Sequence, residues 1–171
     1  DRVFQRATGR IIVSTFASLV SRVQQVANAA IRHNRKMAFV GFSMVENMKM
    51  ARELGYLQVP DDLLVEIGQT NHMPKGKVVI MTTGTQGEPL SALSRMSRGE
   101  HRSISITADD LIILSSSLIP GNEEAVYGVI DALAKVGARV VTNQQARVHV
   151  SGHAYAGELL FLYNVIRPRN V

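Results

Sequence analysis

Runs of β-branched residues alternate with segments of helical periodicity along the whole sequence. A run such as Ile11-Ile12-Val13, bounded by Gly9, is typical of a buried strand. From Ser18 to His33, apolar residues instead recur every three or four positions with arginines and glutamines between them, which indicates an amphipathic helix. Strands that alternate with helices predict a parallel sheet covered by helices on both faces.

The same patterns assign the remaining elements. Strands are predicted at Ile11–Phe16, Lys36–Gly41, Lys77–Thr83, Leu111–Ser116, Arg139–Thr142 and Val148–Val150. Helices are predicted at Ser18–His33, Ser43–Gly55, Leu90–Arg98, Asn122–Val136 and Ala154–Ile166, with a short helix after Pro60. Ser43, with Glu46 at the capping-box position, is predicted to cap the second helix. We therefore predict a three-layer, Rossmann-like α/β domain with a mainly parallel sheet.

Length and composition predict one domain over residues 1–171. An apolar fraction of 46% in 171 residues is enough for a buried core. The absence of cysteine excludes disulfides and thiolate metal sites and fits the cytoplasm, where we expect the protein. No apolar run reaches transmembrane length, and no signal peptide opens the sequence. A start without Met and an end just after an apolar helix suggest an excised fragment.

The charge balance indicates an anionic partner. The net charge is +5, which favours a polyanion such as nucleic acid, although many domains are mildly basic without binding one. Aromatic residues make up 5% of the chain and Trp is absent, which argues against an RNA-binding sheet that stacks bases on aromatic rings. Contacts to the phosphate backbone are therefore favoured over base-specific contacts.

Two polar, glycine-bearing segments each follow a predicted strand. The first is Thr83–Pro89, which contains Thr85, Gln86, Gly87 and Glu88; the second is Arg147–Ala154. Loops at the carboxyl ends of parallel strands meet in one crevice, where ligands bind. Glycine-rich loops expose backbone amides that bind anions. A phosphate therefore suits this pair of loops better than an apolar ligand.

Of the two segments, His149-Val150-Ser151-Gly152-His153 gives the more specific prediction of a phosphate site. Strand alternation places His149 and Ser151 on one side, and His153 opens the final helix. A helix start stabilises an anion through its free amides. Ser43 has similar geometry and is a weaker phosphate candidate. Arg95 and Arg98, three residues apart on a predicted helix, could contact RNA phosphates or form a solvated charged face.

These motifs, in this order, resemble the β-CASP domain of ribonuclease J, a bacterial nuclease of the metallo-β-lactamase type. The resemblance covers essentially the whole chain. It is carried by Gly9–Ala17, Thr83–Pro89 with Leu93-Ser94-Arg95-Met96, Ile119–Glu123 and His149–His153. It implies a zinc-dependent exo- and endoribonuclease of RNA processing and decay, in which this chain clamps the RNA backbone.

The resemblance also implies roles for individual residues. Glu88 matches the acidic motif and is expected to orient a histidine; His153 matches the histidine motif and is expected to act as a proton donor at the reacting phosphate. Substrate-binding roles are implied for the remaining motif residues, namely His149, Ser151, Gly152, Thr85, Gln86, Gly87 and Arg95.

Zinc in this family is held by the β-lactamase portion, which flanks the β-CASP insert. This sequence has no His-x-His-x-Asp-His cluster, so the chain alone is predicted to bind no metal and to be inactive. The final helix, 154–167, is expected to lie at the junction with that portion. RNA and the β-lactamase portion are the predicted partners, with no membrane; oligomerisation of the parent is left open.

The alternative is a binding-only or oligomerisation module without catalysis. A dinucleotide-binding domain would have a glycine fingerprint after its first strand, with an acidic residue about 20 positions further on. Here Ala17-Ser18-Leu19-Val20 follows that strand, so dinucleotide binding is disfavoured. The apolar stretch Leu159–Leu162 would serve self-association equally well as packing on another portion of the protein.

Overall fold

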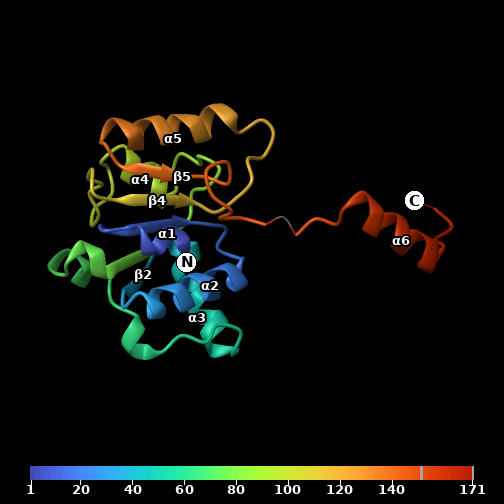
Figure 1. Ribbon diagram of the computed structural model, residues 1–171, viewed down its shortest axis with the longest axis horizontal. Coiled ribbons are helices and arrows are strands. Elements are labelled where there is room, and N and C mark those ends of the chain that lie inside the picture. The colour runs from blue at the N-terminus through green and yellow to red at the C-terminus, as the bar shows by residue number, and fades with distance from the viewer. Residues whose placement is uncertain (151, 171) are drawn as a thin grey trace.

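The computed structural model describes residues 1–150 and 152–170. Its centre is an all-parallel sheet of five strands in the order β2-β3-β1-β4-β5 (Figure 1). The strands are β1 (Ile11–Ser14), β2 (Lys36–Val40), β3 (Val78–Thr82), β4 (Leu111–Leu114) and β5 (Arg139–Val141). The predicted parallel α/β architecture is therefore confirmed.

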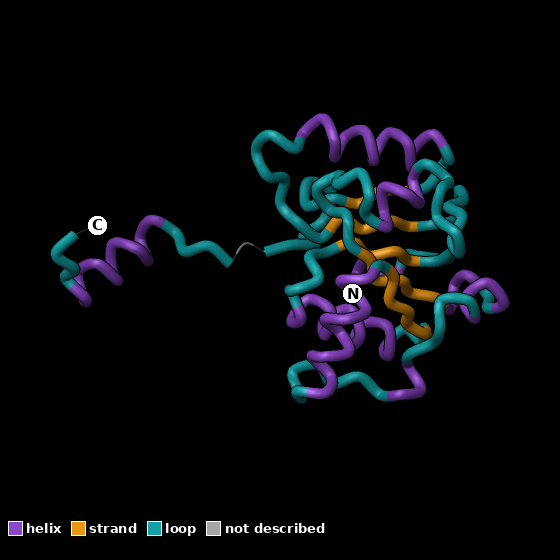
Figure 2. Tube along the Cα trace, turned by 180° about the vertical axis from the view of Figure 1, so that it is seen from behind, coloured by secondary structure: helices purple, strands orange, loops and turns teal. Residues whose placement is uncertain are grey.

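Helices cover both faces of the sheet, which Figure 2 shows as orange strands between purple helices. One face carries α2 (Val20–Arg32) and α3 (Phe42–Glu53), together with the short α1 (Arg2–Gln5) that the sequence patterns did not predict. The other face carries α4 (Ala92–Ser97) and α5 (Glu123–Lys135). Single turns of 3-10 helix at Asp61–Leu63, Gln69–His72 and Lys75–Lys77 lie between α3 and β3.

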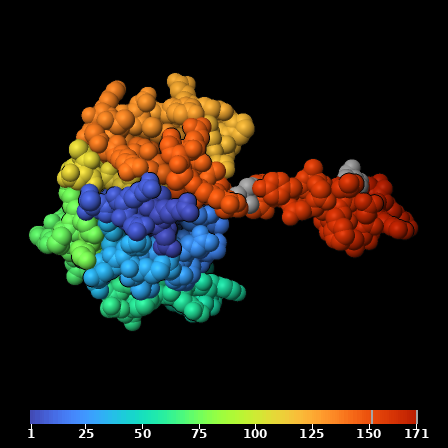
Figure 3. Space-filling view, viewed as in Figure 1, coloured from blue at the N-terminus to red at the C-terminus, as the bar shows by residue number. Residues whose placement is uncertain are grey.

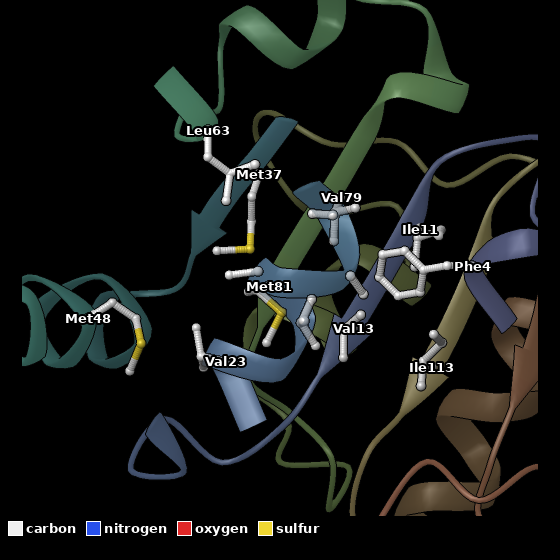
Figure 4. Packing of buried hydrophobic residues seen from close by; sticks show 14 of the residues in the cluster. Phe4, Ile11, Val13, Val23, Met37, Met48, Leu63, Val79, Met81 and Ile113 are labelled. Carbon is white, nitrogen blue, oxygen red and sulfur yellow. The ribbon is translucent and has the colours of Figure 1, made fainter. Parts of the chain in front are cut away.

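Alternation along the strands divides the core into two clusters. Ile11 and Val13 point toward α2 and α3, whereas Ile12 points toward α4 and α5. Figure 4 shows the first cluster, in which Met37, Met48 and Met81 pack with Val23 and other apolar side chains. Each central strand is buried on both sides, which is why these strands read as continuous apolar runs in the sequence.

The amino edge of the sheet is held by buried charges that the sequence patterns did not reveal. Arg10 makes a two-pronged ion pair with Asp110: Nε donates to Oδ1 at 3.0 Å and Nη2 donates to Oδ2 at 2.7 Å. Arg35 donates to the carbonyl oxygens of Gly9 at 2.7 Å and Ala7 at 2.5 Å. These contacts join the residues that precede β1, β2 and β4.

Two local predictions were wrong. Residues 148–150 do not form a strand: the Val148 carbonyl and the His149 N–H bond to side chains, and the Val148 N–H donates to the Ala146 carbonyl. Ser43 does not cap α3: the helix begins at Phe42 directly after the turn at Gly41, and Ser43 lies inside it. The predicted pairing of Ser43 with Glu46 as a capping box is therefore absent.

The last helix, α6 (Ala156–Ile166), stands apart from the sheet (Figures 1 and 3). It begins at Ala156 rather than at the predicted Ala154, and none of its residues is buried. Its exposed side chains include Leu160, Phe161 and Ile166. None of the helices in the described ranges is long and apolar enough to cross a membrane.

Candidate functional site

Two loops and the first turn of α3 line a crevice of about 280 Å³ at the carboxyl edge of the sheet. They follow β1, β2 and β3, so the crevice lies where a parallel sheet usually binds its ligand. Hydroxyl groups of threonines and serines line it together with apolar atoms, and Glu88 supplies the carboxylate. The lining residues are Thr15, Phe16, Ala17, Ser43, Thr83, Gly84, Thr85, Glu88 and Ser91.

Two glycines give the loop after β3 its shape. Gly84 and Gly87 have φ of +110° and +73°, a region that residues with a side chain rarely adopt. A Cβ on Gly84 would lie 2.3 Å from the Ser91 Oγ, and one on Gly87 would lie 2.5 Å from the Ala125 carbonyl carbon in α5. The loop therefore packs against α4 and α5 so closely that only glycine fits.

Glu88 ends this loop with its side chain exposed at the crevice. One of its oxygens, Oε2, accepts a hydrogen bond from the Gln86 backbone N–H at 3.1 Å, which fixes the direction of the carboxylate. Behind it, Arg98 donates to the Pro89 carbonyl at 2.9 Å and to Glu100 at 2.9 Å. The carboxylate is thus oriented by its own loop and faces the crevice.

Gln86 is buried and joins the loop after β3 to the loop after β4. Its Nε2 donates to the Ser117 carbonyl at 3.0 Å and approaches the Ser116 Oγ at 3.4 Å. Its Oε1 accepts from the Ile119 backbone N–H at 3.1 Å and from Asn122 Nδ2 at 3.3 Å. Both ends of the amide therefore bond within the protein, and contact between Gln86 and substrate stays a prediction.

The segment that bears His149 is held at the same edge. The Val148 carbonyl accepts a hydrogen bond from Ser115 Oγ at 2.7 Å and another from Arg22 Nη1 at 2.8 Å. The His149 backbone N–H donates to Asn143 Oδ1 at 3.2 Å. Burial lowers the pKa of His149 below 6.5 and the Arg22 charge lowers it further, while the Ser115 backbone raises it.

Three consecutive serines after β4 connect the two predicted motifs. Ser115 bonds to the Val148 carbonyl, whereas Ser116 and Ser117 bond to Gln86. All three follow Leu114, the last residue of β4, at the carboxyl edge. Sequence reasoning did not single them out; the available signal was a polar triplet directly after a fully apolar strand.

The remaining predicted site residues are not among those that line the crevice. His153 and Gly152 belong to the exposed segment that leads to α6 (Figure 1), and Ser151 lies outside the described residues. Contact between His153 and Glu88 therefore stays a prediction. Arg95 is exposed on α4, where its guanidinium approaches the Glu100 carbonyl at 3.5 Å. RNA contact by Arg95 also stays a prediction.

The site residues do not suit a zinc ion. No group of three or more histidines and carboxylates that could hold a metal occurs among residues 1–150 and 152–170. His149 is partly buried, and the positive charge of Arg22 acts on its imidazole. A neighbouring cation disfavours the binding of a metal cation at the same ring.

Comparison with known proteins finds relatives along nearly the whole chain. Residues 8–133 match the family model described as "Ribonuclease J, beta-CASP domain". The chain is 69% identical over 170 residues to "Ribonuclease J" of Mycolicibacterium smegmatis and 68% identical to that of Mycobacterium tuberculosis. It is 56% identical over 169 residues to "Ribonuclease J" of Corynebacterium glutamicum. These matches cover 99% of this chain but only 24% to 30% of the relatives' length.

Proposed function

Because the chain belongs to the ribonuclease J β-CASP domain family, we propose that it clamps the RNA backbone in a zinc-dependent ribonuclease that acts in RNA processing and decay. The observation that carries this proposal is the serine triplet Ser115–Ser117. It ties the Glu88 loop and the His149 segment to the end of one strand, so both act at one edge of the sheet.

In this proposal His153 donates a proton to the oxygen that leaves the cleaved phosphodiester, and Glu88 accepts a hydrogen bond from an imidazole and orients it. The glycine-bearing loop after β3 and the positive charge of the domain hold the phosphates. Few aromatic side chains are present, so we expect the enzyme to select bases only weakly.

We place zinc outside this chain, in a β-lactamase portion of the same protein. The chain spans less than a third of its relatives' length, which leaves ample sequence for such a portion. The exposed apolar side chains of α6, which include Leu160 and Phe161, suit packing on it. Large exposed apolar patches typically mark contact with another protein surface.

The test is His153→Ala and Glu88→Gln in the full-length protein, with single-turnover cleavage of a single-stranded RNA as the measurement. We expect His153→Ala to slow cleavage about 100-fold or more, a typical contribution of a general acid. RNA affinity should change far less, because the backbone contacts remain. His72→Ala is the matched control, since His72 is exposed in a 3-10 turn that precedes β3.

Cleavage at the wild-type rate by His153→Ala would contradict the proposed chemistry. A fall in RNA affinity equal to the fall in rate would show that His153 binds substrate without transferring a proton, and would contradict the proposal in the same way.

A further inference from the structure

We propose that Arg22 and Ser115 are positioning residues that hold the Val148–His149 segment, from which the chain continues to His153. This inference rests on the proposed function, because it assigns the two residues a task in the same reaction. They come from α2 and from the end of β4, which are far apart in sequence. Neither belongs to the motifs that identify the family in this sequence.

The two donors meet at one atom. The Val148 carbonyl oxygen accepts from Arg22 Nη1 at 2.8 Å and from Ser115 Oγ at 2.7 Å, and a carbonyl has two lone pairs to receive them. The next residue, His149, is held through its backbone N–H by Asn143. No strand ladder fixes residues 148–150, so these side-chain bonds replace it.

Burial strengthens this arrangement. Ser115 is 1% exposed, and burial lowers the pKa of the Arg22 guanidinium, which remains charged. Arg22 is itself partly buried, and a charged donor makes a stronger hydrogen bond to a carbonyl than a neutral donor. Losing Arg22 would leave Ser115 as the one side-chain donor that the described residues offer to the Val148 carbonyl.

Arg22 also acts on the imidazole of His149. Its charge lowers the pKa of His149, in the same direction as burial, and contact with the Ser115 backbone opposes both. Arg22 lines a cavity of about 520 Å³, and the other charged residues of its lining are Asp1, Arg2 and Arg147. Burial and the Arg22 charge therefore both favour the neutral imidazole of His149, whereas the Ser115 backbone favours the charged form.

The experiment compares Arg22→Met and Ser115→Ala with the control Arg32→Met, which removes an exposed arginine from the same helix. In the 171-residue chain, NMR measures hydrogen exchange of the His149 amide and the titration of its imidazole. We expect Ser115→Ala to speed exchange roughly threefold to tenfold, with the His149 pKa little changed. Arg22→Met should speed exchange more and raise the pKa, because a nearby positive charge is lost.

The same variants are then measured in the full-length protein with a single-stranded RNA oligonucleotide. We expect kcat to fall about 10- to 100-fold in Arg22→Met and less in Ser115→Ala, with KM changed less than about threefold, because misplacement affects the reaction more than binding. Arg32→Met should match the wild type in every measurement. If Arg22→Met does not fold, Ser115→Ala alone carries the test.

Unchanged exchange and an unchanged His149 pKa in Arg22→Met would overturn the anchoring, as would unchanged exchange in Ser115→Ala. Faster exchange with wild-type kcat would overturn its part in the reaction. A different result would contradict the proposed function: cleavage of RNA by His153→Ala at the wild-type rate, whatever the Arg22 variants do.

Discussion

Single side chains hold together parts of this molecule that lie far apart in sequence. Arg10 and Asp110 are 100 positions apart, yet their ion pair joins the residues before β1 and β4. Both side chains are almost completely buried, at 6% and 0% exposure. A charge left alone at such a position is strongly unfavourable, because neither water nor a counter-ion compensates it.

We expect Asp110→Ala to lower the free energy of unfolding by about 3–5 kcal/mol, because Arg10 would stay buried without its partner. Urea denaturation of the 171-residue chain measures this. Asp61→Ala, which breaks the exposed pair between Arg52 and Asp61, is the control and should cost only a small fraction as much, since water screens it. Equal losses in the two variants would contradict the role given to the buried pair.

The helices differ in what they contribute to the fold. The α2 helix buries Val23, Val26 and three alanines against the sheet, so the sheet and helix stabilise each other. In contrast, α6 buries nothing, although it is among the most apolar segments of the chain. Its composition therefore fits contact with a further portion of the protein, whereas α2 belongs to the core.

Ending the chain at Val150 should leave the folded sheet nearly as stable as before. We expect the free energy of unfolding to change by less than about 1 kcal/mol, because no core residue is removed. Self-association at high concentration should fall, since Leu160, Phe161 and Ile166 are removed with the helix. Denaturant titration and analytical ultracentrifugation measure the two effects. A large loss of stability would show that α6 packs on the sheet.

In our proposal, the net positive charge of the domain drives its binding to RNA. A net charge of +5 with few aromatic residues favours contacts to phosphates over stacking on bases. For single strands, the logarithm of affinity falls with the logarithm of salt concentration by about 0.7 for each phosphate contacted. The salt dependence therefore reports the number of phosphates held.

We expect the 171-residue chain to bind single-stranded RNA weakly, with affinity that falls steeply as salt is raised and differs little between poly(A) and poly(U). Fluorescence anisotropy over a salt series measures both. Arg95→Gln should reduce the salt dependence by the equivalent of about one phosphate if Arg95 contacts the backbone. Binding that ignores salt or strongly prefers one base would contradict backbone clamping.

The alternating sequence patterns determined the five strands of the sheet, the helices α2 to α5 that cover it, the two-sided burial of the strands and the loop that carries Glu88. These features follow from the sequence because periodicity along a few residues decides which side chains can be buried together. The tight turn after β3 could also be predicted from the sequence, because such a turn requires glycine within the loop itself.

Only the tertiary structure decided which residues meet across the chain. The strand order β2-β3-β1-β4-β5, the Arg10–Asp110 pair, the serine triplet that joins two motifs and the Arg22 bond to Val148 all depend on contacts between distant segments. The strand predicted at Val148–Val150 is absent, and there the Val148 carbonyl accepts from two side chains while the His149 N–H donates to a third. The two bonds to the Val148 carbonyl join residues that are 126 and 33 positions apart. Such distant partners leave no local pattern in the sequence, so only the tertiary structure identifies them.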